Sequence, residues 1–172
     1  EISACLVGSE MCIRDRCVSY GEMGVYVHSF TPSLDINSAT TTFNWHIKYF
    51  AYAACTIPNP FGASEAKGWI KLSVNILDVT TGYWMLNGNQ ELTIWSANNV
   101  LGIGNWEVDA DSTFTQRISS HFVSGHLYLF YAKINTYTLD AGGGLGWAHT
   151  VIDIAPDGGD GRGAWITSVT IY

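Results

Sequence analysis

The chain carries little charge, and basic residues are its scarcest component. Only 13% of its 172 residues are charged, with 8 Lys and Arg against 15 Asp and Glu, which gives a net charge of −7. The few basic residues are scattered along the chain and form no cluster. A protein that binds nucleic acid or an anionic membrane surface carries a basic patch. The sequence therefore predicts no nucleic-acid partner.

Long apolar runs and helical periodicity are also missing. No apolar run is long enough to span a bilayer, so we expect no membrane insertion. No segment keeps a 3.6-residue period with caps at its ends, which predicts very little helix. At 172 residues and 47% hydrophobic, the chain suffices for one domain with a core and is too short for two.

The first sixteen residues differ in kind from the rest. Residues 6–16, LVGSEMCIRDR, resemble the conceptual translation of a transposase-type sequencing adapter, and residues 1–5 fit the constant arm and the variable index that precede it. Non-native segments are excluded from fold reasoning. We therefore treat residues 1–16 as an adapter-derived segment and residues 17–172 as a single domain. The resemblance implies that the native N-terminus is missing, and no signal peptide is visible.

Cysteine is scarce as well. Two of the four cysteines, Cys5 and Cys12, fall in the adapter-like segment, which leaves Cys17 and Cys55. Cys17 lies at the junction, whereas Cys55 lies late in an alternating stretch and is expected to be a small core residue. Whether Cys17 and Cys55 pair stays open, and so does the redox compartment.

Alternation of apolar and polar residues is abundant. In residues 68–79, Ile70, Leu72 and Val74 share one face of a predicted strand while polar residues take the other. Further strands are predicted at residues 24–30, 42–56, 90–96, 103–108, 111–119, 125–137, 145–155 and 164–172. Eight to ten short strands punctuated by turns predict an all-β fold. We expect a two-sheet antiparallel β-sandwich, jelly-roll-like in its connections.

The stretch from Gly125 to Ala155 contains two of these strands, joined by the glycine-rich residues 138–144. Both runs are rich in aromatic and β-branched residues, and together they favour a hairpin. With Phe130 opposite Ile152, one face of this hairpin is almost continuously apolar. Such a face needs a second sheet to cover it.

Two carboxylates, Glu107 and Asp109, are the candidate catalytic residues. They alternate on one predicted strand and so share a face. The string resembles the start of the Glu-x-Asp-x-x-Glu signature of jelly-roll retaining glycosidases such as laminarinases and lichenases. That resemblance implies a nucleophile at Glu107, but Ser112 occupies the position of the acid/base that completes the two-carboxylate mechanism. The alternative is a solvated acidic strand end without catalysis.

The acidic loops are candidate Ca²⁺ ligands, because hard oxygen donors on glycine-rich turns suit that ion. The candidates are Asp153, Asp157 and Asp160, with Asp109 and Asp111 as a second group. The alternative is that Asp and Gly are simply good turn formers. The five histidines show no tight spacing for zinc. No cofactor is predicted apart from a structural Ca²⁺.

Tryptophan is the most informative residue type, with seven copies. Trp69 and Trp95 fall in the polar phase of their predicted strands, and Trp147 and His149 share a face opposite Ile152. Exposed planar rings beside amides and carboxylates are suited to stacking on sugars. These four residues are therefore the candidate ligand-binding residues. The alternative is that a sandwich buries each Trp at a sheet end or under a loop.

In style, residues 24–172 resemble the small jelly-roll modules of secreted or cell-surface prokaryotic proteins. The resemblance lies in the Asp78-x-Thr80-x-Gly82 turn, the Gly125-His126-x-Tyr128 strand start and the long aromatic strand at residues 42–56. It implies a non-catalytic structural or adhesive module. A carbohydrate-binding module is the second hypothesis and a glycosidase the third. The partner is accordingly a polysaccharide or another surface protein.

Overall fold

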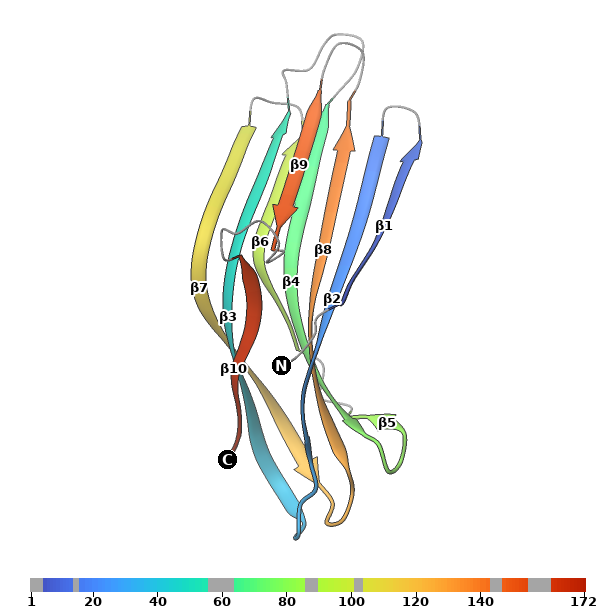
Figure 1. Cartoon of the computed structure of the whole chain (residues 1–172), viewed down its shortest axis with the longest axis vertical. Helices are drawn as coiled ribbons and strands as arrows, with labels where there is room; N and C mark the ends of the chain where they lie inside the picture. Colours follow the sequence, from blue (N-terminus) through green and yellow to red (C-terminus); the bar gives the residue numbers. More distant parts are fainter. Residues whose placement is uncertain are drawn as a thin grey trace.

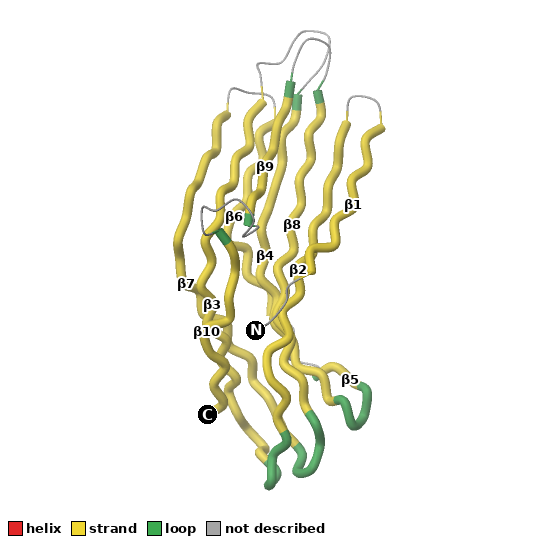
Figure 2. The backbone as a smooth tube through the Cα atoms, in the orientation of Figure 1, coloured by secondary structure: helices red, strands yellow, loops and turns green. Residues whose placement is uncertain are grey.

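The computed structural model describes residues 5–13, 16–55, 64–85, 90–100, 104–142, 147–154 and 162–172. These residues form ten strands and contain no helix. The described part of the chain therefore has no helix that could cross a membrane. The strands follow the long axis of an elongated two-layer sandwich (Figure 1; Figure 2). The predicted two-sheet antiparallel β-sandwich is confirmed.

Sheet A contains six strands in antiparallel pairs. Its order is β1 (Cys5–Ile13), β2 (Arg16–Phe30), β8 (Tyr128–Ala141) and β4 (Glu65–Asp78). Both β6 (Gln90–Val100) and the two-residue β5 (Tyr83–Trp84) pair with β4. The adapter-like segment supplies β1 and thus stands at an edge of the sheet.

Sheet B is built around β3 (Ile36–Cys55), the longest strand. On one side β3 pairs with β7 (Gly104–Phe122) along nearly its whole length. Its other partners are β9 (Ala148–Asp153), which pairs with residues 50–55, and β10 (Gly163–Ile171), which pairs with residues 41–48. One edge of β3 is therefore covered by two short strands that follow one another.

The core lies between the sheets and follows the predicted alternation. On β3 the inward residues from Phe43 to Tyr49 are almost fully buried, and on β4 the same holds from Ile70 to Ile76. Cys55 is also buried, as expected of a small core residue. Near one end of the sandwich the core is aromatic, with edge-to-face contacts among Phe30, Phe43, Phe122, Tyr128 and Phe130.

One buried amide ties the two sheets together. Gln116 on β7 accepts a hydrogen bond of 2.9 Å from Trp45 Nε1. Its amide nitrogen donates to the carbonyl oxygens of Leu72 and Gln90 in sheet A. A buried polar group that meets all its partners fixes the relative position of the layers it joins.

The hairpin predicted from the stretch 125–155 is wrong. Its two strands are β8 and β9, which lie in different sheets. Both edges of β8 are taken along almost their whole length, by β2 and by β4. Because no edge of β8 remains for β9, the chain crosses over after Ala141 and β9 pairs with β3 instead.

Two strands that the sequence separated form a single one. Of the predicted strands 103–108 and 111–119, residues 104–108 and the whole of the second are part of β7, which continues through Asp109 and Ala110, and residue 103 lies outside the described residues. Those residues pair with Phe50 and Tyr49 of β3 without a break in register. The length of β3 thus overrides the turn propensity of the acidic residues.

Candidate functional site

The outer face of sheet B gathers aromatic and charged side chains into one strip along β3. The outward residues of β3 alternate with the core residues, and they are flanked by β7 on one side and by β9 and β10 on the other. We call this surface the β3 strip. It comprises His46, Lys48, Phe50 and Tyr52 of β3, Glu107, Asp109 and Asp111 of β7, and His149 and Trp165 of β9 and β10.

Trp165 is the most prominent ring of the strip. A Cβ atom added to Gly163, two residues earlier on β10, would lie 2.9 Å from Cζ2 and 3.0 Å from Cη2 of the indole. The benzo ring therefore lies over Gly163, in the space that a side chain there would need. Trp165 remains 44% exposed. The absence of a side chain at position 163 lets a large ring rest against the sheet while much of its surface faces solvent.

His46 and Asp111 form a polar pair beside this ring. The centroids of the His46 and Trp165 rings are 5.4 Å apart. His46 Nε2 lies 2.6 Å from Asp111 Oδ1. Because a carboxylate only accepts, the histidine donates this hydrogen bond. One row further, Asn44 donates to Ser168 Oγ and accepts from Thr115 Oγ1. Polar groups thus surround the indole on both sides of its row.

Glu107 and Asp109 share the outer face, as predicted, and both are exposed. They flank Tyr52 and Phe50 in register. Ser112, at the position of the glycosidase acid/base, belongs to the opposite, inward phase of β7 and pairs with the buried Ile47. A two-carboxylate mechanism needs an acid kept protonated by a desolvated setting. The exposed pair on β7 supplies no such setting.

At the other end of the strip lie Trp147 and His149. Trp147 is 51% exposed, and the ring of His149 lies 6.2 Å from that of Tyr52. The structure therefore places His149 beside Tyr52, and Trp147 lies one residue before the start of β9. They lie several residue steps along β3 from Trp165, which pairs with His46.

The predicted calcium ligands are not assembled in the described residues. Asp153 forms an ion pair of 2.5 Å with Arg162, which brackets the segment between β9 and β10. Asp157 and Asp160 lie outside the described residues. Asp111 is bonded to His46. Among the described residues, no three His, Cys, Asp or Glu side chains come together as a metal site.

Trp69 lies on the outer face of sheet A, in a row with Tyr137 of β8 and Tyr20 of β2. Its ring is stacked on Tyr137 at 5.7 Å with an interplanar angle of 17°. The ammonium of Lys71 lies 4.8 Å from the centre of the Trp69 ring, and the same ammonium pairs with Glu91. The side chains of Tyr137 and Lys71 thus already contact the surface of the Trp69 ring.

The prediction that Trp95 is an exposed ligand-binding residue is wrong, because Trp95 is only 9% exposed and belongs to the core. Trp95 pairs with Ile70, whereas the next pair along β4 is Lys71 with Thr93. Ile94 is therefore an extra residue in a β-bulge, which reverses the phase of the strand. The indole fills the space over Gly68, where an added Cβ atom would lie 2.7 Å from Trp95 Cζ3.

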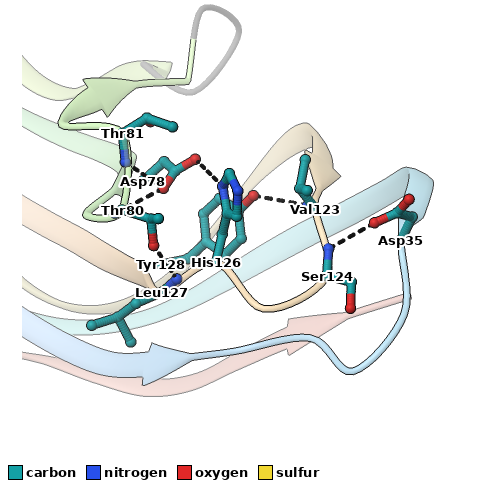
Figure 3. Close-up of polar contacts among 9 residues, drawn as sticks. All are labelled: Asp35, Asp78, Thr80, Thr81, Val123, Ser124, His126, Leu127 and Tyr128. Atoms are coloured by element: carbon teal, nitrogen blue, oxygen red, sulfur yellow. Dashed lines mark hydrogen bonds and ion pairs between the residues drawn. The ribbon is translucent and has the colours of Figure 1, made fainter.

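A set of hydrogen-bonded side chains and main-chain groups connects the loops at one end of the sandwich (Figure 3). Asp78 Oδ2 lies 2.8 Å from His126 Nδ1, while Asp78 Oδ1 accepts from the main-chain N–H groups of Thr80 and Thr81. Leu127 N donates to Thr80 Oγ1. We call this group, with Asp78 and His126 at its centre, the loop clasp. It joins residues of the two short motifs, the Asp78 turn and the Gly125-His126 strand start, that contribute to the jelly-roll resemblance.

The loop clasp holds Asp78 as a carboxylate. Burial by itself raises the pKa of Asp78, but the hydrogen bonds from His126 and Thr81 and the charge of His126 outweigh burial and lower it. Gly82 closes the turn with φ of 77° and donates to the Asp78 carbonyl. The described contacts of the clasp are all internal, so its role is to fix the turn between β4 and β5 against the start of β8.

Sequence reasoning missed the pairing of Trp165, His46 and Asp111. These residues come from three strands that are far apart in the sequence, so no local pattern joins them. One local signal was present, because a glycine two residues before a tryptophan on the same strand face leaves room for the ring. Comparisons with protein-family models, curated proteins and solved structures return no match for this chain.

Proposed function

We propose that this protein is a non-catalytic carbohydrate-binding module of a secreted or cell-surface protein, which holds a polysaccharide along the β3 strip. The observation that carries the proposal is Trp165, 44% exposed and lying over Gly163. A ring that rests against a sheet presents its opposite face to a flat ligand such as a pyranose ring. The chain crosses from one sheet to the other, for example between β8 and β9, and this supports the jelly-roll connections that we propose for the module.

The neighbours of Trp165 supply the polar half of such a site. The Asp111 carboxylate and the His46 ring can accept or donate hydrogen bonds to sugar hydroxyls on one side of the indole. Asn44 and Ser168 do the same on the other side. Further along, Tyr52 offers an additional ring beside Glu107, whereas the ring of Phe50 already lies under the guanidinium of Arg162 at 5.2 Å. Apart from its two histidines, the strip carries three carboxylates and one cationic side chain, Lys48, which favours a neutral glycan over a uronate-rich one.

A structural or adhesive module that binds no sugar is the second candidate. It is favoured by the outer face of sheet A, where Trp69, Tyr137 and Lys71 are engaged with one another. Surface rings of that kind stabilise a sheet through cross-strand pairs and need no ligand. A protein partner on the cell surface would then replace the polysaccharide.

Titration against a panel of soluble neutral and acidic polysaccharides tests the proposal, with tryptophan fluorescence as the signal. We expect a saturable change with a neutral glycan that is lost in Trp165→Ala and kept in the matched control Trp69→Ala. Release of reducing ends would indicate a glycosidase, and we expect none. A folded protein that responds to no glycan in the panel would leave the structural module as the better description.

A further inference from the structure

Two buried oxygen atoms at the end of the sandwich where β8 finishes have no hydrogen-bond partner. They are Ser64 Oγ, just before β4, and Asp140 Oδ1, near the end of β8. Ser64 is 1% exposed. The Asp140 side chain is 25% exposed, but this one of its oxygens is buried. A buried polar atom without a partner is rare in folded proteins, and an ordered water or an ion usually accounts for it.

The register places the two atoms on the same side of sheet A. Asp140 pairs with the buried Ala66, two residues after Ser64, so both side chains belong to the inward phase of adjacent strands. Diagonal neighbours of this kind have Cα atoms about 7–8 Å apart, which lets their side chains reach a common small ligand. Thr150 of β9 approaches from sheet B, where its hydroxyl donates to the Leu139 carbonyl.

Asp140 has one ion pair among the described residues, and this pair does not involve Oδ1. His149 Nδ1 lies 3.9 Å from the other carboxylate oxygen, Oδ2. On β4 the nearby Lys67 belongs to the outward phase and pairs with Glu65. A water molecule would satisfy the hydrogen-bonding capacity of Asp140 Oδ1 but would supply no positive charge. The two atoms without partners are a carboxylate oxygen and a hydroxyl oxygen, which are donors that suit a hard cation.

We infer that Ser64 and Asp140 hold a Ca²⁺ ion between the sheets, with main-chain carbonyls and water completing its coordination. The site is distinct from the acidic loops, and it does not depend on the proposed carbohydrate binding. One carboxylate makes a weak site, so the expected dissociation constant is about 0.1–1 mM, in the range of extracellular Ca²⁺-binding modules. Binding couples the end of β8 to the start of β4.

Titration of the full chain with Tb³⁺, followed by competition with Ca²⁺, tests this inference. Trp95 lies over Gly68, one alternate position beyond Ala66, and is close enough to sensitise Tb³⁺ luminescence. We expect luminescence that Ca²⁺ displaces, and a rise in Tm of about 3–10 °C in 10 mM Ca²⁺. The variant Asp140→Asn should lower the affinity for Tb³⁺ and Ca²⁺ at least tenfold, and so reduce both the luminescence and the rise in Tm. Ser64→Ala should reduce them less. The matched control Glu22→Gln, which changes an exposed acid of β2, should leave both unchanged.

The metal-free proteins provide an independent readout. Because Asp140→Asn removes the charge from a side chain with one buried oxygen that has no partner, this variant should match or exceed the wild type in Tm when a chelator is present. A wild-type Tm that ignores Ca²⁺, together with luminescence unaffected by Asp140→Asn and Ser64→Ala, would overturn the inference and leave a buried water as the explanation.

Discussion

The outer faces of the two sheets both carry tryptophan on a strand, but they use it differently. On sheet A, Trp69 is stacked on Tyr137 and covered by Lys71. On sheet B, Trp165 lies over a glycine and touches one partner ring, that of His46. The residue type is the same, whereas the residues around it decide whether its surface is used inside the fold or presented to a ligand.

The comparison shows why counting exposed aromatics does not locate a site. A ring flanked by side chains of similar length on the neighbouring strands stacks on them, since cross-strand neighbours are about 5 Å apart. A ring beside a glycine has no such neighbour on that side, so it packs flat against the glycine backbone. The local sequence around each tryptophan therefore predicts its role better than its exposure does.

The largest expected effect is on glycan binding by the sheet B ring. Trp165→Ala removes the exposed indole and should weaken binding of the responsive glycan at least tenfold, which corresponds to about 1.4 kcal/mol. The free energy of unfolding should change little, because much of this side chain is already in water. Isothermal titration calorimetry and denaturant unfolding measure the two quantities. Unchanged affinity would remove Trp165 from the proposed site.

The matching change on sheet A, Trp69→Ala, should lower stability and leave glycan affinity as it is. Trp69→Ala removes the stack on Tyr137 and the contact with Lys71, and each contributes about 0.5–1 kcal/mol. We expect the free energy of unfolding in guanidinium chloride to fall by about 1–2 kcal/mol, with glycan affinity unchanged. Loss of binding in this variant, with the fold intact, would move the site from sheet B to sheet A.

The loop clasp should affect stability and leave both faces as they are. The pKa of Asp78 is lowered in the folded protein, so its stabilisation is present above the ordinary value near 3.8 and is lost as the pH falls through the lower folded value. Asp78→Asn should therefore cost about 1 kcal/mol at pH 7. The deficit should shrink in urea unfolding below pH 3.8. A deficit that persists unchanged at pH 2 would contradict this account.

The smallest expected effect comes from the residue beneath the sheet B ring. Gly163→Ala places a methyl group 2.9 Å from Trp165 Cζ2, so the indole must lift from the sheet. Glycan affinity should fall, but by less than in Trp165→Ala, because the ring remains present. Gly125→Ala is the matched control, since Gly125 also has a positive φ but a Cβ atom there meets nothing within 4 Å. Equal affinities in both variants would show that the resting position of the ring does not matter.

Much of the sandwich could be predicted from alternation alone. The inward residues of β3 and β4 are those that the period of two assigns to one face. The partner of a strand could not be predicted in the same way. Residues 125–137 and 145–155 have complementary apolar faces, but the structure uses that complementarity between the sheets and not within a hairpin.

The candidate site was predicted in part. Glu107, Asp109 and His149 do lie on one outer face, because their strand phases were assigned correctly. Trp95 failed because one extra residue, Ile94, shifts the phase, and nothing in the local sequence marks a bulge there. Trp165 and His46 meet only through the pairing of β10 with β3, which depends on the whole fold.

The division of one edge of β3 between β9 and β10 has a consequence for sequence change. Each short strand takes its register from β3 independently, and the pair of Asp153 and Arg162 holds the two ends together. Residues between them can then vary in length and composition at a small entropic cost, without shifting either strand. The residues at the two ends of this segment, Asp153 and Arg162, lie beside Phe50 of the β3 strip, so a lineage of such proteins, or an engineer, could alter ligand preference by changes there while the sandwich stays the same.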